Sequence, residues 1–226
     1  MGKIETPVLQ GLNFTIQPGE FVAIMGQSGS GKSTLLNILG CLDRASAGTL
    51  LLDGHDVSRL VDDELAELRS SCIGFVFQFH FLLDEFTCEE NAVMPILIRK
   101  GHVPRTDRDR VRKLLRRVGL SSVMDHTPDT MSGGQNQRCA IVRALANEPS
   151  LILADEPTGN LDRRSGEEVF SLLRDMNKEI GAAVILVTHD DRLAAEADRI
   201  LSIEDGLISE VEVADLYRGR SAARAQ

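Results

Sequence analysis

A glycine-rich segment between an apolar run and a helical pattern constrains this chain more than any other feature. The apolar run Phe21–Met25 predicts a buried strand, and the segment after it has the pattern GxxxxGKS. Glycines adopt backbone torsions that other residues avoid, so consecutive N–H groups can turn towards phosphate oxygens at a helix start. The segment therefore predicts a polyphosphate-binding loop. Its residues are Gly26, Gln27, Ser28, Gly29, Ser30, Gly31, Lys32 and Ser33, and Thr34 follows them.

Two side chains of this loop have expected roles. We expect the Lys32 ammonium to reach the β- and γ-phosphates and the Ser33 hydroxyl to bind Mg²⁺. The alternative is an ordinary glycine-rich turn between a strand and a helix, and the rest of the chain must decide between the two.

Composition limits the classes of protein to which the chain can belong. With 226 residues, 42% of them apolar, the chain is long enough to bury a core without disulfides. The cysteines Cys41, Cys72, Cys88 and Cys139 have no metal-binding spacing and are expected to be reduced thiols, mostly buried. The net charge of −9 disfavours nucleic acid as the main partner. No apolar run approaches the ~18 residues of a membrane span, so we expect membrane contact only through a partner.

Apolar runs alternate with helical patterns along the chain. This order predicts a parallel sheet that is covered on both faces, with its ligand site beyond the carboxyl ends of the strands. The expected strands lie within 8–24, with a break at 17–20, and at 50–54, 73–77, 151–156 and 183–189, and the expected helical regions at 89–119 and 164–180.

Polar side chains stand where the expected strands end. Asp155 ends an aliphatic strand, as an acid that holds a Mg²⁺-bound water beside the phosphate loop would do. Glu156 follows it and is positioned to activate the attacking water as a general base. Gln78 and His189 end two further strands, and we expect His189 to have a catalytic or switch role. The sequence therefore predicts that these groups converge on one site.

A second anion-binding helix start follows Met131. A small polar residue and two glycines open a helix there, which gives free N–H groups and a capping hydroxyl. These residues are Ser132, Gly133, Gly134 and Gln135. One nucleotide per chain satisfies the first loop, so the second helix start needs a ligand of its own.

Together these motifs resemble those of the ATP-binding-cassette (ABC) ATPases, over nearly the whole chain. The segment 131–135 resembles the signature LSGGQ, Gln78 the Q-loop glutamine, 159–162 the D-loop and His189 the switch histidine of that family. The resemblance implies one P-loop NTPase domain of the RecA-like α/β class over residues 1–226. It implies a mostly parallel sheet core, an antiparallel β subdomain and a helical subdomain inserted at approximately residues 86–146.

The resemblance also implies how the chain works. Two copies pack head to tail, and the signature residues of one copy close over the γ-phosphate of ATP held by the other. Ser33, Gln78 and Asp155 serve Mg²⁺, Glu156 is the base, and Asp162 couples the subunits. The implied partners are separately encoded permease subunits, with no nucleic acid and with membrane contact only through the permease. The implied location is the cytoplasmic side of the bacterial inner membrane.

Two segments narrow the resemblance. QFHFLLDEFT at 78–87 and ADEPTGNLD at 154–162 are similar to those of ATPase subunits of lipoprotein-releasing transporters, with MacB-type exporters and FtsE-type ATPases as near relatives. The alternatives are therefore an FtsE-like ATPase that moves no cargo and a non-transport ABC ATPase. A P-loop kinase is disfavoured by the signature segment and Glu156.

Three further expectations concern the ends of the chain and a basic helix. Members of the family stack adenine on an aromatic residue ahead of the segment 8–12. Residues 1–7 contain no aromatic residue, and the only tyrosine, Tyr217, lies near the other end of the chain. Either the chain as given begins too late or adenine is held another way; we favour the first and expect weak ATP binding that an upstream extension restores.

Residues 217–226 are expected to be a flexible tail. The basic segment 105–117 is expected to be a solvated face rather than a site for a partner or acidic lipid.

Overall fold

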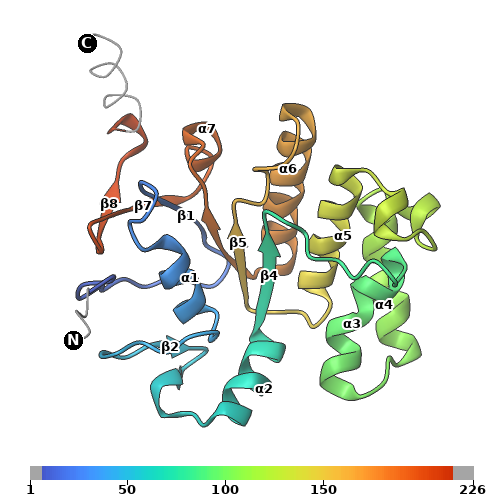
Figure 1. Cartoon of the computed structure of the whole chain (residues 1–226), viewed down its shortest axis with the longest axis horizontal. Coiled ribbons are helices and arrows are strands. Elements are labelled where there is room, and N and C mark those ends of the chain that lie inside the picture. Colours follow the sequence, from blue (N-terminus) through green and yellow to red (C-terminus); the bar gives the residue numbers. More distant parts are fainter. Residues whose placement is uncertain (1–6, 216–226) are drawn as a thin grey trace, which may run out of the picture.

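A six-stranded sheet forms the centre of the computed structural model, which describes residues 7–215 (Figure 1). The strand order is β4-β5-β6-β1-β7-β8, and all strands are parallel except β8, which pairs antiparallel with β7. This agrees with the predicted α/β class. The strands are β1 (Phe21–Met25), β4 (Ile73–Phe77), β5 (Leu151–Asp155), β6 (Ala183–Val187), β7 (Arg199–Glu204) and β8 (Leu207–Val211).

Alternate residues of the central strands face opposite sides of the sheet, so the sheet has two apolar faces. On β5, Leu151 and Leu153 enter one core, while Ile152 and Ala154 enter the other. Helices pack on both faces and make a three-layer structure. Those on the first face are α1 (Lys32–Leu39) and α2 (Asp62–Cys72), and those on the second are α5 (Gly133–Leu145) and α6 (Arg163–Ile180).

The connection from β4 to β5 forms a helical lobe beyond the edge of the sheet (Figure 1). It contains α3 (Cys88–Lys100) and α4 (Arg105–Arg117), which pack on α5 around a third apolar cluster. Ile96, Leu115 and Cys139 are fully buried there, one from each helix. Because α5 also packs on the sheet, this helix joins the lobe to the core.

Part of the basic face of α4 is structural. Arg108 and Arg112 hold the two oxygens of Glu89, at 2.7 and 2.6 Å, and the Glu89 carboxylate is almost completely buried. Burial raises the pKa of Glu89, but hydrogen bonds from Arg112 and Arg108 outweigh burial and hold that pKa below its usual value. Arg117 pairs with Glu179 of α6. Three arginines of the face that was expected to be plainly solvated therefore make ion pairs within the chain.

The strand expected between Val8 and Ile16 does not form. Leu12, Phe14 and Ile16 do alternate in burial and pack against the core, as the sequence pattern indicated. A strand also needs a neighbouring backbone, and this segment makes only isolated bonds, such as Gln10 N–H to Gly206 O at 2.7 Å. The pattern therefore predicted the side-chain directions correctly and the ladder wrongly.

Short elements complete the chain. The strand expected at 50–54 is the shorter β2 (Leu51–Leu52), which pairs antiparallel with β3 (His55–Asp56). The remaining elements are η1 (Val57–Arg59), η2 (Ser121–Val123), η3 (Pro128–Thr130) and α7 (Asp191–Ala194). All four cysteines are free thiols and only Cys72 is not buried, as expected. Residues 1–6, Tyr217 and the predicted tail 217–226 lie outside the described residues, so the expectations for them are not tested by the structure.

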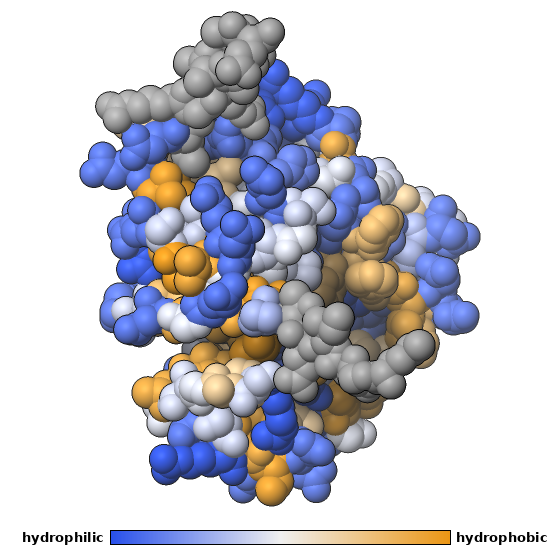
Figure 2. Space-filling view, turned by 60° about the vertical axis from the view of Figure 1, so that its left-hand side comes forward, coloured by the Kyte–Doolittle hydropathy of each residue, from blue (hydrophilic) through white to orange (hydrophobic). Residues whose placement is uncertain are grey.

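The surface near the β7–β8 edge is mixed. Figure 2 shows hydrophobic residues there in small groups between hydrophilic ones. Leu207 of β8 is one exposed apolar side chain of this strand. No helix within residues 7–215 combines the length and the apolar character that crossing a bilayer requires.

Candidate active site

Four neighbouring strands end in a single row. The register pairs Phe77 with Asp155, Asp155 with Val187, and Val187 with Ile24. Because these strands are parallel, the residues that follow the row emerge at one edge of the sheet. The groups selected from the sequence follow it closely: Gln78 after β4, Glu156 after β5, His189 after β6 and the loop 26–33 after β1.

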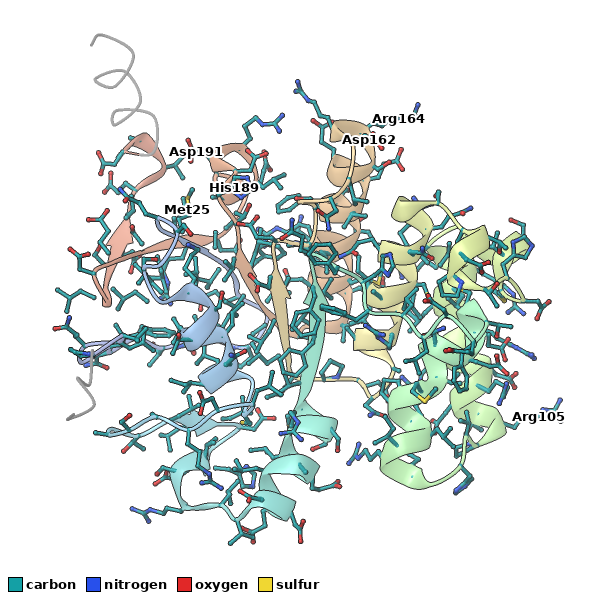
Figure 3. All side chains as sticks on the ribbon, in the orientation of Figure 1. Met25, Arg105, Asp162, Arg164, His189 and Asp191 are labelled. Carbon is teal, nitrogen blue, oxygen red and sulfur yellow. The ribbon has the colours of Figure 1, made fainter. Side chains whose placement is uncertain are left out.

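The same edge carries the start of α6. Figure 3 shows His189 and Asp162 on the side of the molecule to which β4 and β5 point, whereas Arg105 lies at the far end of the helical lobe. The structure thus gathers the strand-end residues and the D-loop segment on one side, and the basic helix start away from them.

The loop after β1 leads into a helix whose N–H groups are open. Gly31 precedes α1 with φ of +105°, a conformation that favours glycine, and no side chain of the described residues caps this helix. The first-turn N–H groups therefore need another acceptor, which an anion supplies. The Ser30 hydroxyl oxygen is buried and lacks a hydrogen-bond partner within residues 7–215.

The Lys32 side chain curls back over the loop. Its Nζ donates to the carbonyl oxygens of Gly26 and Gln27, both at 2.8 Å. An ammonium has three donors, so one is left for a ligand in the loop. The loop therefore presents backbone N–H groups and a fixed positive charge to the same space, which suits a polyphosphate.

The carboxyl group of Asp155 is partly buried, and its pKa is raised. Burial raises the pKa of its carboxyl, the neighbouring Glu156 raises it further, and Lys32 opposes both. A divalent cation beside Asp155 would relieve the cost of burying this negative charge. Ser33, Gln78 and Asp155 supply the oxygen donors that Mg²⁺ prefers. Within residues 7–215, no group of three or more His, Cys, Asp or Glu side chains is arranged to hold a metal ion.

Glu156 and His189 form a pair at the end of β5 and β6. His189 Nδ1 lies 2.8 Å from Glu156 Oε1, and the Glu156 N–H donates to Val187 O. Glu156 has φ of +45°, a strained conformation for a residue with a side chain and one that clusters at functional sites. The carboxylate is therefore held by both backbone and side chain where the strands end.

The signature segment lies apart from the phosphate loop of the same chain. Ser132 accepts from the Gln135 N–H at 3.2 Å and caps α5, and its own N–H donates to Gln135 Oε1 at 2.8 Å. β4 and β5 stand between α5 and α1 in Figure 1. Ser132 and Gly133 are exposed, so this helix start is accessible from outside the chain.

Asp162 has a role within its own chain. Its carboxylate accepts from the Ser165 N–H at 3.1 Å and the Ser165 hydroxyl at 2.6 Å, and it caps α6. These hydrogen bonds lower the pKa of Asp162, the one from the Ser165 hydroxyl most. Asp190 caps α7 in the same way and accepts from the Arg192 N–H at 2.9 Å.

Three residues near Gln78 were not found from the sequence. Gln137 of α5 donates to Phe77 O at 2.9 Å, Arg143 donates to two backbone oxygens of the next loop, and Asn160 bonds to Gln78 itself. Asn160 lies two positions before Asp162 in the D-loop segment, and this was the one feature of the sequence that could have pointed to it. Gln137 and Arg143 lie on a helix whose pattern gave no reason to select them.

The chain is similar to known ATP-binding subunits. The family described as "ABC transporter" matches residues 9–159. The lipoprotein-releasing system ATP-binding protein LolD 1 of Rhodopseudomonas palustris is 52% identical over 206 residues, which is 91% of each chain. LolD of Anaeromyxobacter dehalogenans is 49% identical over 98% of this chain and 91% of its own. The macrolide export ATP-binding/permease protein MacB of Syntrophobacter fumaroxidans is 48% identical over all of this chain but only 32% of its own.

Solved structures agree with these relatives. The ATP-binding cassette MJ0796 in a dimeric post-hydrolysis state, bound to ADP and Pi, has a TM-score of 0.84 at 42% identity over 94% of both chains. The cassette CbiO1 of Clostridium perfringens has a TM-score of 0.84 at 29% identity over 96% of this chain and 87% of its own. With the phosphate loop, the acidic strand end and the capped signature helix in place, the chain belongs to the ABC transporter family and is one of its ATP-binding ATPases.

Proposed function

We propose that this chain is the ATP-hydrolysing subunit of a bacterial lipoprotein-releasing complex and drives separately encoded membrane subunits. The observation that carries the ATPase part is the single row of strand ends, which brings the phosphate loop, Asp155, Glu156 and His189 to one edge. The lipoprotein part is supported by the LolD relatives, which match 91% or more of this chain at about half identity. The whole chain, 1–226, is then one ATPase domain, with the helical subdomain at approximately 86–146.

Each residue of the edge has a proposed task in hydrolysis. Lys32 and the N–H groups of residues 26–34 stabilise charge on the β- and γ-phosphates. Glu156 accepts a proton from the attacking water, and His189 contacts the γ-phosphate. The 2.8 Å distance between His189 Nδ1 and Glu156 Oε1 supports these two roles. The contact through Nδ1 positions the Glu156 carboxylate, and the other ring nitrogen of His189, Nε2, is left to contact the phosphate.

We assign Ser33, Gln78 and Asp155 to Mg²⁺. When bound, Mg²⁺ neutralises charge between the β- and γ-phosphates. The raised pKa of Asp155 supports this assignment, because that carboxyl has lost hydration and faces Glu156 without a fully compensating cation. Ser33 at the start of α1 and Gln78 after β4 provide the neutral oxygens.

The site is completed by a second copy of the chain. Ser132, Gly133, Gly134 and Gln135 of one subunit close over the γ-phosphate held by the other, and Asp162 couples the two sites. The exposure of Ser132 and Gly133 supports this arrangement, as does the dimeric cassette MJ0796. Loss of the γ-phosphate removes the ligand that joins the two copies.

The proposed docking surface for the membrane subunits lies beside Gln78. Phe79 and Phe81 are each 62% exposed, and Leu83 and Phe86 continue this apolar group. Large exposed apolar side chains in one segment are typical of an interaction site. The chain would then lie on the cytoplasmic side of the inner membrane, in contact with the bilayer only through its partners and without nucleic acid.

Co-purification tests this function. A tagged Glu156→Gln chain, extracted from membranes with ATP present, is expected to bring down two membrane subunits and a bound lipoprotein. Phe79→Ser should lose these partners while it keeps the ATPase activity of the isolated chain. The matched control is Leu207→Ser, which changes an exposed apolar residue on β8. A MacB-type permease without lipoprotein, cell-wall enzymes without cargo, or a ribosome would each reject lipoprotein release.

A further inference from the structure

The turn after β5 holds the side chain of Gln78. Gln78 Nε2 donates to Asn160 Oδ1 at 3.0 Å, and Asn160 Nδ2 donates to the Gln78 backbone oxygen at 3.3 Å. The Gln78 side chain lies across Gly159, where a Cβ atom would stand only 2.8 Å from Nε2 and 3.0 Å from Cδ. The two segments therefore meet through a reciprocal pair of amides and a close approach, and a Cβ atom at position 159 would push the Gln78 side chain aside.

The backbone on either side of Gln78 is fixed from another direction. Gln137 donates to Phe77 O at 2.9 Å, and Arg143 donates to His80 O and Phe81 O, both at 2.6 Å. Gln137 is almost completely buried, so its donor has no water to replace the bond. With the backbone held by α5, the freedom left to Gln78 is the rotation of its side chain, and Asn160 restrains that rotation.

The direction of these bonds fixes which end of the Gln78 amide points where. The Gln78 backbone oxygen can only accept, so Asn160 must turn its NH₂ towards it and its oxygen towards the Gln78 side chain. Asn160 Oδ1 can only accept, so Gln78 must present its nitrogen there. The Gln78 amide oxygen is consequently the end that stays free. An amide oxygen can bind a divalent cation, whereas an amide nitrogen cannot.

We propose that Asn160 is a positioning residue that orients Gln78 so that its amide oxygen, not its nitrogen, is offered to the metal ion of the nucleotide. This rests on the metal role proposed above for Gln78. In the absence of Asn160 the Gln78 side chain samples several rotamers as well as both orientations of its amide, and only the arrangements that offer the oxygen to the ion can bind it.

The test measures how much Mg²⁺ strengthens ATP binding, without any turnover. In a Glu156→Gln background, calorimetric titrations give the Kd for ATP in EDTA and in Mg²⁺. The readout is the Kd in EDTA divided by the Kd in Mg²⁺, which is large when Mg²⁺ strengthens binding. Asn160→Ala is expected to lower this ratio about three- to tenfold, the effect of one lost hydrogen bond. Gly159→Ala should lower it too, because its methyl group displaces the Gln78 side chain and removes no hydrogen-bonding group.

A double variant separates this proposal from the function on which it rests. Gln78→Ala alone should lower the ratio, and adding Asn160→Ala should lower it no further, since Asn160 acts through Gln78. If Gln78→Ala leaves the ratio unchanged, the metal role of Gln78 is wrong. If Gln78→Ala lowers the ratio but Asn160→Ala does not, or if the two effects multiply in the double variant, the metal role stands and the positioning role is overturned.

Discussion

His189 Nδ1 lies 2.8 Å from Glu156 Oε1, which joins the ends of β5 and β6 across the edge of the sheet. The two side chains differ in exposure: 77% for His189 and 18% for Glu156. A side-chain contact with one exposed partner adds little to stability, so it can open and close at low cost. This geometry suits a general base, Glu156, whose contact with His189 positions the carboxylate and can still be broken during the reaction.

Glu156→Gln should separate binding from hydrolysis. The amide keeps the size of the side chain but cannot take a proton, so ATP turnover is expected to fall by about 10² to 10⁴. ATP binding should persist, and the variant should accumulate as a closed dimer. Phosphate release and light scattering measure the two effects. Glu210→Gln, which changes an exposed glutamate of β8, is the matched control and should behave as wild type. Near-normal turnover in Glu156→Gln would remove Glu156 from the role of base.

His189→Ala should affect activity and leave the fold intact. The side chain is mostly exposed, so the free energy of unfolding is expected to change by about 0.5 kcal/mol or less. Turnover should fall by at least about tenfold, because Glu156 loses its partner and the γ-phosphate loses a contact. Urea unfolding and steady-state ATPase assays test both parts. A stability loss that matches the activity loss would contradict this assignment.

Much of the fold could be predicted because it depends on local patterns. The strand Ile73–Phe77 is bounded as the apolar run predicted, and the loop 26–33 needs only its own glycines. Contacts between residues that are distant in the sequence could not be predicted from local patterns. The bond between Gln78 and Asn160 spans 82 positions, and nothing in the sequence around either residue indicates the other as its partner. The expected strand at 8–16 was wrong for a related reason, since a ladder depends on a partner backbone that the segment's own pattern does not specify.

Two substitutions at Ser132 should divide its roles in capping and in binding. Ser132→Ala removes the cap of α5, which should cost about 1 kcal/mol, and also weakens the ATP-driven dimer. Ser132→Asp keeps a capping oxygen, so stability should be retained, but its charge repels the phosphate of the opposite subunit. Thermal unfolding and light scattering with ATP in the Glu156→Gln background distinguish the two. A stable Ser132→Asp chain that still dimerises with ATP would show that this helix start does not meet a phosphate.

The raised pKa of Asp155 predicts a dependence of stability on pH. A carboxyl whose pKa is higher in the folded than in the unfolded state costs stability once it is ionised. The cost is absent below the unfolded pKa, where both states are protonated, and it is fully present above the folded pKa. Asp155→Asn, which is neutral at every pH, should therefore melt a few degrees above wild type at pH 7 without nucleotide.

This gain should disappear as the pH falls towards 4, and Mg-ATP should stabilise wild type more than Asp155→Asn, because the variant cannot offset the charge of the cation. Thermal unfolding at several pH values, with and without Mg-ATP, measures both trends. Asp175→Asn, which changes an exposed aspartate of α6, is the control and should show neither. A variant less stable than wild type at pH 7 would mean that Asp155 is held by favourable contacts instead of being kept charged for a cation.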